Sequence, residues 1–436
     1  MLIDFSFSNF LSFGKPVTFS MQAAKTVKEL ATGETSNVFK IDGNDLNLLK
    51  TSAVYGANGS GKSNLIDAMS FFRHAILNSA SIDNVFSRNK LFFLFDNKSE
   101  SLPTSFEMVF LVDGIKYRHG FEILNGQIIT EWLFCQSANA LRESYCFKRE
   151  KNKIQINSKT FKGAAGLNSK TRSNALFLSV AAQFNVSVAL AIRSWLRKKF
   201  NVISGLEGST LSYTASQYRE NSIMHSQILD FIKLSDTGIV DINIIESPKS
   251  TDIIENVGQI ESAPLKVSKK YDILSFHDYY SDGEILGQTS IPFALESLGT
   301  KKIFSLSGPW FDTLRNGGVL VVDEFGASLH TQMSIELTRL FQSPLNVSNA
   351  QLIVITHDTN LLRRDLFRRD QIWFVEKDSH GVSDLYSLVE YKINQATSVR
   401  NNASYEKDYL MGKYGAIPFF GNLEKFLLDY GKRESI

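Results

Sequence analysis

The chain has 436 residues, of which 43% are hydrophobic and 21% charged, proportions that are ordinary for a soluble globular protein. A net charge of +2 excludes a strong whole-molecule attraction to nucleic acid, so any DNA contact must come from a local patch. Two cysteines, Cys135 and Cys146, exclude a disulfide scaffold, and no stretch reaches the roughly 20 apolar residues that span a bilayer. The N-terminus lacks the basic region of a signal peptide, so we expect a cytoplasmic protein with no membrane contact.

The first part of the chain predicts short strands. Residues 2–20 alternate apolar and polar side chains, which indicates two strands joined by a turn, whereas residues 22–48 look polar and irregular. A strand is expected at 51–56, before a glycine-rich turn and an amphipathic helix. Asp113-Gly114 and Asn125-Gly126 then separate three further apolar runs, and such dipeptides favour hairpin turns.

The second part predicts first helices and then alternating helices and strands. Residues 174–235 look helical, with Leu190 among the expected core positions, and a mixed strand segment fills about 238–290. Continuous apolar runs at 319–322 and 352–355 are typical of fully buried parallel strands.

A phosphate-binding loop is the first motif with a chemical meaning. Residues 56–63 fit G-x-x-x-x-G-K-[ST] between the expected strand and helix, which is the context this motif requires. Its glycines let backbone N–H groups turn toward phosphate oxygens, Lys62 supplies a cation and Ser63 a hydroxyl ligand for Mg²⁺. We expect the nucleotide to contact Gly56, Asn58, Gly59, Ser60, Gly61, Lys62, Ser63 and the adjoining Asn64.

Acidic and histidine side chains follow the two buried strands. Asp323 and Glu324 end the first strand, at the edge where ligands bind in α/β sheets. We expect Asp323 to hold Mg²⁺ with Ser63, and Glu324 to accept a proton from the attacking water. His357 follows the second strand and could orient the γ-phosphate, so Glu324, His357 and Lys62 are the candidate catalytic residues.

A second possible anion site precedes a later helix. Ser297 and Gly299 lie in Glu296–Thr300 just before a helical segment, and a helix N-terminus of this kind binds anions. The residues alone leave open whether this is a plain helix cap or a site for the nucleotide of a second subunit.

The order of these motifs resembles that of ABC-type ATPases of the RecF, structural-maintenance-of-chromosomes and OLD group. Details are closer to bacterial AAA-type ATP-binding proteins of phage-defence operons, including RloA-like proteins and the ATPase of the PARIS system. The matching segments are Asn9–Phe13, residues 56–63, E-S-x-G-T at Glu296–Thr300, D-E-x-x-x-S-L-H at Asp323–His330, Thr356–His357, R-R-D-Q-I-W-F-V-E-K at Arg368–Lys377 and Y-L-x-G-x-Y-G-A-I-P at Tyr409–Pro418.

The resemblance implies an α/β ABC-type ATPase head, with a mixed central sheet carrying the phosphate loop, an antiparallel β lobe and a helical insertion. The corresponding divisions are 1–165, 166–290 and 291–436. It further implies a head-to-head homodimer that sandwiches two ATP molecules with Mg²⁺. Ser297 and Gly299 of one head would contact the γ-phosphate held by Lys62 of the other, and Ser328 and His330 would belong to the D-loop beside it. The glutamine of the Q-loop is left open between Gln127 and Gln136.

Three functions remain after this comparison. The first is a defence ATPase that acts as sensor or scaffold for a separately encoded effector, because no nuclease-like carboxylate pair follows Asp358. The second is a RecF-like clamp, in which basic residues at 193–199 and at Arg363, Arg364, Arg368 and Arg369 could line a DNA groove, although a solvated helix face is the plainer explanation of these charges. A scaffold that never hydrolyses ATP is disfavoured by Glu324. The motifs at Arg368–Lys377 and Tyr409–Pro418 fit either packing at a sheet edge or a partner surface.

Overall fold

The computed structural model describes residues 1–27, 36–41, 46–83, 85–86, 91–203, 208–247, 271–393, 397–398 and 404–417. Pro418, the end of the last motif, lies outside these ranges. Within them the chain forms two large sheets and a smaller three-stranded one.

The first sheet is an antiparallel lobe of seven strands in the order β10-β9-β8-β7-β6-β1-β2. Its two N-terminal strands pair antiparallel, as the alternation in residues 2–20 predicts. Asp113 and Gly114 have φ of 50° and 76°, and Asn125 and Gly126 have φ of 52° and 74°, so both dipeptides form the expected left-handed hairpin turns. The strands are β1 (Leu2–Ser8), β2 (Val17–Ser20), β6 (Thr104–Val112), β7 (Ile115–Leu124), β8 (Gln127–Gln136), β9 (Ser144–Glu150) and β10 (Lys153–Ile156).

The second sheet is the central one, in the order β11-β15-β16-β5-β17-β18. Its first five strands are parallel, and β18 pairs antiparallel at the edge. Every residue of β5, β15 and β16 is buried, which confirms the parallel strands predicted from the continuous apolar runs. The strands are β5 (Thr51–Tyr55), β11 (Phe200–Ile203), β15 (Val319–Val322), β16 (Gln351–Ile355), β17 (Ile372–Lys377) and β18 (Ser383–Ser387).

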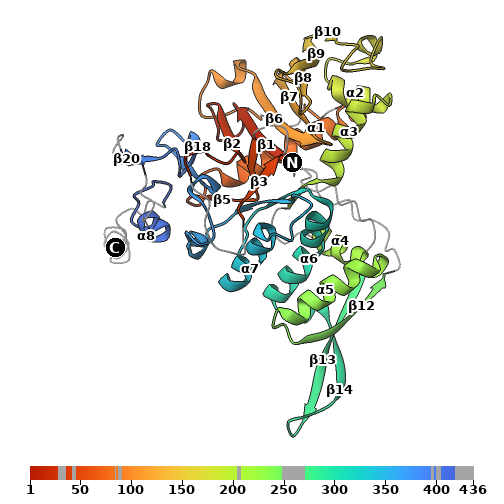
Figure 1. Cartoon of the computed structure of the whole chain (residues 1–436), viewed down its shortest axis with the longest axis vertical. Helices are drawn as coiled ribbons and strands as arrows, with labels where there is room; N and C mark the ends of the chain where they lie inside the picture. Colours follow the sequence, from red (N-terminus) through yellow and green to blue (C-terminus); the bar gives the residue numbers. More distant parts are fainter. Residues whose placement is uncertain are drawn as a thin grey trace, which may run out of the picture.

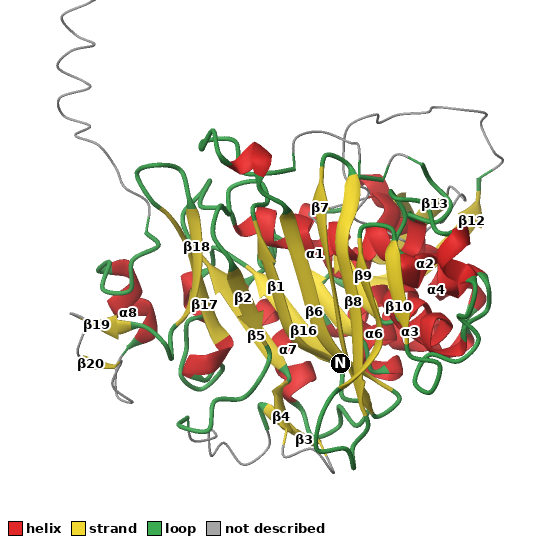
Figure 2. Ribbon diagram, turned by 90° about the horizontal axis from the view of Figure 1, so that it is seen from above, coloured by secondary structure: helices red, strands yellow, loops and turns green. Residues whose placement is uncertain are grey.

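Helices and the lobe cover opposite faces of the central sheet. Val54 and Val321 pack into a core shared with helix α1 (Lys62–Asn78) and the lobe. Tyr55 and Val322, the next residue on each strand, pack into a second core with α6 (Leu298–Asn316) and α7 (Thr331–Gln342). In Figure 2, β1 and β6 of the lobe lie over β5 and β16. The predicted fold class, a mixed central sheet with a phosphate loop and an antiparallel lobe, is confirmed.

A helical insertion leaves the lobe and returns to the central sheet. It holds α2 (Phe177–Gln183), α3 (Ser187–Lys198), α4 (Gly208–Glu220), α5 (Ser222–Leu234) and the sheet β12 (Ile239–Glu246), β13 (Tyr271–Ser281) and β14 (Glu284–Pro292). The insertion packs on α6 through α4 and α5. Figure 1 shows the β13–β14 hairpin projecting from the body.

The sequence missed several local features. Residues 22–48, expected to be irregular, contain strand β3 (Val38–Ile41) and most of strand β4 (Leu46–Leu49), which pair antiparallel. Leu190 is 38% exposed, because it lies on the outer face of α3, so its assignment to the core is wrong. The remaining elements are the short strands β19 (Lys392–Ile393) and β20 (Thr397–Ser398) and helix α8 (Tyr405–Leu410).

The described helices include no single one that is long and apolar enough to cross a membrane. Only α2 and α3 taken together pass that test by length and composition, and they are bent by 102°. Both helices contribute buried residues to the core beneath the lobe.

Candidate functional site

The phosphate loop connects β5 to α1 at the carboxyl edge of the central sheet. Gly61 caps α1 with φ of 111°, a conformation that favours glycine. A Cβ atom at Gly61 would collide with Ser383 Oγ and lie 2.7 Å from Ser12 Oγ. A Cβ at Gly56 would likewise collide with the Val375 carbonyl oxygen. Both glycines are therefore needed for neighbouring strands to approach the loop.

Lys62 lies folded back on the loop that precedes it. Its ammonium donates to the carbonyl oxygens of Gly56 and Ala57, each at 2.8 Å. Burial lowers the pKa of Lys62 to about 8, against a smaller opposing effect of Asp323. An ammonium held by the carbonyl oxygens of its own loop can exchange these partners for phosphate oxygens of opposite charge.

Ser63 and Asp323 meet across the loop. The Ser63 hydroxyl hydrogen-bonds the Asp323 carboxylate, whose pKa burial raises above its usual range. The backbone of Asp323 is fixed by a 2.8 Å bond from its N–H to the Ile203 carbonyl oxygen of β11. One hydroxyl and one carboxylate in contact suit Mg²⁺, which keeps most of its other positions for water and phosphate. These two residues therefore fit the metal site expected from the sequence.

Glu324 and His357 open into the same cavity of about 590 Å³ as Lys62, Ser63 and Asp323. Both side chains are exposed, and Glu324 has φ of 50°, a strained backbone conformation of the kind found at functional sites. Burial and the nearby Lys62 lower the pKa of His357. The cavity is lined by Asn58, Gly59, Gly61, Lys62, Ser63, Asn64, Asp323, Glu324, Ile355, His357 and Lys377.

Ser60 lies in the loop but outside this lining. Its side chain is 3% exposed, and its hydroxyl is buried without a hydrogen-bond partner among the described residues. Asp67, one turn into α1, was not foreseen: burial and the neighbouring Asp323 raise its pKa to about 6.

The sequence reasoning also missed a group of hydroxyls beneath the loop. Ser383 Oγ donates to the Ser60 carbonyl oxygen at 2.5 Å and lies 2.7 Å from Ser12 Oγ. Asn64 Nδ2 donates to Ser12 Oγ at 2.7 Å. Ser12 belongs to the N-terminal motif Asn9–Phe13, so that motif braces the phosphate loop. Lys377 ends β17 at the cavity, which gives the R-R-D-Q-I-W-F-V-E-K segment a place in the site.

The signature motif lies away from this cavity. Ser297 caps α6, its Oγ accepting from the Thr300 N–H at 3.1 Å. A Cβ at Gly299 would lie 2.9 Å from the Ser328 carbonyl oxygen, so the helix start packs directly on the D-loop segment of the same chain. His330 caps α7 through Nδ1, which accepts from the Gln332 N–H. The structure brings Ser297, Gly299 and Ser328 together, but none of them lines the cavity around Lys62.

The late motifs are mainly structural in the described residues. Arg368 is 5% exposed and pairs with Asp370 at 2.7 Å, and Asp370 accepts from the Ala24 N–H. The prediction that Arg368 lines a DNA groove is therefore wrong, because its charge is neutralised inside the protein. Arg363 is exposed but pairs with Asp365 at 2.9 Å. In the last motif, Tyr409 is buried, and its hydroxyl donates to the Ala416 carbonyl oxygen.

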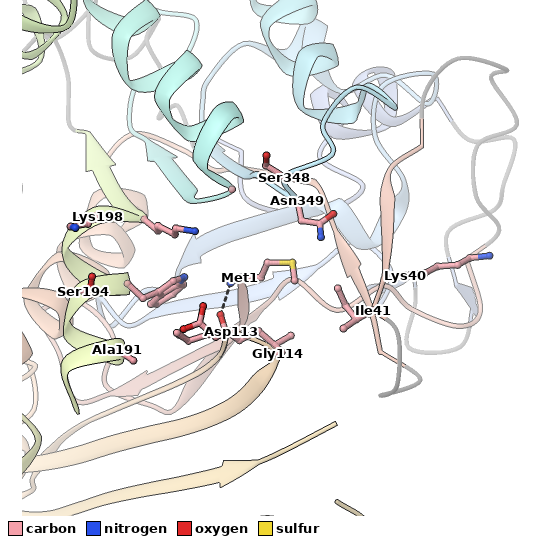
Figure 3. A pocket seen from close by; sticks show the side chains of 15 residues that line it. Met1, Lys40, Ile41, Asp113, Gly114, Ala191, Ser194, Lys198, Ser348 and Asn349 are labelled. Carbon is pink, nitrogen blue, oxygen red and sulfur yellow. Dashed lines mark hydrogen bonds between the residues drawn. The ribbon is translucent and has the colours of Figure 1, made fainter. Parts of the chain in front are cut away.

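The basic residues at 193–199, at the end of α3, lie elsewhere. Lys198 and Lys199 line a separate cavity of about 430 Å³ with Lys40 and Asp113. Figure 3 shows Lys198, Ser194 and Asp113 around it, with the Met1 amine donating to Leu111. Gln127 and Gln136, the two candidates for the Q-loop, lie at the ends of β8, and neither lines the cavity around Lys62.

Comparison with known proteins assigns the chain to a family. The model of the family described as "AAA domain, putative AbiEii toxin, Type IV TA system" matches residues 52–363, more than half of the chain. No curated protein matches the sequence.

Similar solved structures include heads of SMC proteins. One is an Smc head bound to the C-terminal winged-helix domain of ScpA: 15% identical, covering 91% of this chain and 99% of that one, with a TM-score of 0.47. The SMC head domain from Thermotoga maritima is 14% identical, covering 88% and 98%, with a TM-score of 0.37. The Smc head of Pyrococcus furiosus with an extended coiled coil, bound to the C-terminal domain of ScpA, is 14% identical, covering 91% and 97%, with a TM-score of 0.39.

Proposed function

We propose that this chain, which belongs to the AAA domain (AbiEii, type IV TA system) family, hydrolyses ATP with Mg²⁺ at sites that a second copy completes. Its membership makes it an AAA-type, ATP-binding ATPase domain. The metal, the dimer and the biological role are the parts that we propose.

Five residues that line the cavity have a role in this mechanism. Lys62 exchanges its two carbonyl partners for the β- and γ-phosphate oxygens, and His357 orients the γ-phosphate from the neighbouring strand. Ser63 and Asp323 would hold Mg²⁺, which neutralises charge developing on the phosphate oxygens. Glu324, exposed in the cavity, accepts the proton of the attacking water.

One observation supports the proposed dimer: the signature motif of a chain lies away from the phosphate loop of the same chain. Ser297 and Gly299 do not line the cavity that holds Lys62. Two exposed apolar side chains also lie at the signature: Leu295 directly before it, at 73%, and Leu298 within it, at 60%. An anion-binding helix start in such surroundings fits the nucleotide and surface of a facing copy. Two copies related by a two-fold axis would then complete two sites at once.

The proposed biological role is that of a sensor or scaffold for a separately encoded effector in phage defence, in the cytoplasm. It is supported by the resemblance of the E-S-x-G-T and R-R-D-Q-I-W-F-V-E-K segments to phage-defence ATPases and by the toxin–antitoxin family description. ATP binding would shift the equilibrium from open to closed heads, and the effector would bind one of these two states.

Complementation between two inactive variants tests the composite site. Lys62→Ala removes the phosphate cation but leaves the signature intact, whereas Ser297→Arg blocks the signature but leaves the loop. Each variant alone should not hydrolyse ATP, and an equimolar mixture should recover activity, because the heterodimer contains one intact site. Activity of Ser297→Arg equal to that of the wild type would contradict the composite site.

The effector is tested separately. Co-expression with the genes beside it, followed by purification with and without ATP, should yield a nucleotide-dependent complex. A chain that purifies without any of these neighbours under every nucleotide condition would contradict the sensor role and leave the ATPase intact.

A further inference from the structure

The Glu296 carboxylate is tied back onto strand β13. Its Oε1 accepts from the Ser275 hydroxyl at 2.5 Å and from His277 Nε2 at 2.7 Å. Ser275 is fully buried, and the Glu296 side chain is 8% exposed. An ionised carboxylate only accepts hydrogen bonds, so both partners act as donors. Glu296 thus has a well-defined position that none of the catalytic steps above explains.

Glu296 lies at the start of helix α6, directly before the N-cap residue Ser297. The first-turn N–H groups of Leu298 and Gly299 have no intrahelical acceptor, and the helix dipole gives this end a partial positive charge. Such an end attracts a nearby carboxylate as it attracts a phosphate. A Glu296 carboxylate released from β13 would therefore compete with the incoming nucleotide for these N–H groups.

We propose that Ser275 and His277 are positioning residues for the composite site. By holding the Glu296 carboxylate on β13, they keep the first turn of α6 open for the phosphate of a nucleotide bound by a second copy. This inference rests on the proposed head-to-head dimer. It also gives the glutamate of the E-S-x-G-T motif a purpose and connects the signature to the base of the projecting β13–β14 hairpin (Figure 1).

Four proteins separate positioning from mere packing: Ser275→Ala/His277→Ala, Glu296→Gln, their triple combination, and the wild type. The double variant frees a charged carboxylate, so its kcat/KM should fall on the order of tenfold, while ATP affinity of the isolated head stays unchanged. Glu296→Gln keeps an acceptor oxygen without the charge and should remain near the wild type. Adding Glu296→Gln to the double variant should recover most of the lost activity.

Hydrogen exchange provides a readout that does not depend on turnover. In the double variant, the Leu298 and Gly299 amides should exchange more slowly than in the wild type, because the released carboxylate accepts from them. Glu296→Gln should reverse this protection. Loss of activity that Glu296→Gln fails to restore, together with unchanged amide exchange, would overturn the proposal.

Different experimental outcomes would overturn the proposed dimer and the proposed positioning role. A wild-type protein that neither dimerises with ATP nor hydrolyses it would overturn the proposed function, whatever the exchange experiment shows. A wild type that does both, with a double variant that matches it in kcat/KM and exchange, would overturn only the positioning role of Ser275 and His277.

Discussion

Two glycines of the phosphate loop provide a matched test of its packing. Gly59 and Gly61 both have positive φ, 74° and 111°, but a Cβ at Gly59 would meet nothing within 4 Å. Gly59→Ala should therefore cost only the strain of the backbone, roughly 1 kcal/mol. At Gly61, backbone strain on the order of 1–3 kcal/mol adds to overlap with Ser12 and Ser383, which costs a further ~1–3 kcal/mol.

These energies translate into measurable shifts. At about 2.1 cal/mol/K for each of the 436 residues, unfolding entropy is roughly 0.9 kcal/mol/K, so each kcal/mol lowers Tm by about 1 °C. We expect a loss of about 1 °C for Gly59→Ala and about 2–6 °C for Gly61→Ala. The affinity of Gly61→Ala for a fluorescent ATP analogue should be at least about tenfold lower than that of Gly59→Ala, because the loop N–H groups move away from the phosphates. Equal Tm and equal affinity in the two variants would refute the packing argument.

Three further predictions each concern a single residue and its surroundings. His119 is fully buried, and its pKa is lowered from 6.5 to about 4, so the unfolded state binds more protons between these pH values. The free energy of unfolding should therefore fall by up to ~3 kcal/mol from pH 6.5 to 4. In denaturant titrations, the difference in unfolding free energy between the wild type and His119→Phe should shrink over that range. Gly299→Ala forces the signature away from the Ser328 carbonyl oxygen and should abolish turnover without weakening ATP binding to the isolated head; normal turnover would contradict this. Arg368→Ala leaves Asp370 buried and unpaired and should cost about 3–5 kcal/mol in thermal unfolding, with no change in any DNA affinity; a selective loss of DNA binding would revive the clamp.

The sequence predicted the parts of the site that are contiguous in the chain. The phosphate loop and the strand ending in Asp323 and Glu324 were recognisable because their chemistry and their apolar flanks lie within a few residues. The carboxyl ends of parallel strands meet at one edge, so Lys62 and His357 were also expected to converge there, as they do.

The parts that the sequence missed depend on distant contacts. Ser12 and Ser383 touch although 371 positions separate them, and no local pattern reveals such a pair. Strand β11 has only four residues, too few to show a period within a helical stretch. Arg368 was misread because a charge in the sequence does not reveal that Asp370 neutralises it inside the protein.

The central claim is that ATP binds between two copies of the chain, and solution mass measures it most directly. Light scattering should be recorded with and without ATP on the wild type and on Glu324→Gln, beside phosphate release. The account predicts that Glu324→Gln binds ATP, releases no phosphate and accumulates an ATP-dependent dimer or larger assembly. A mass that ignores nucleotide, together with normal hydrolysis by Glu324→Gln, would contradict it.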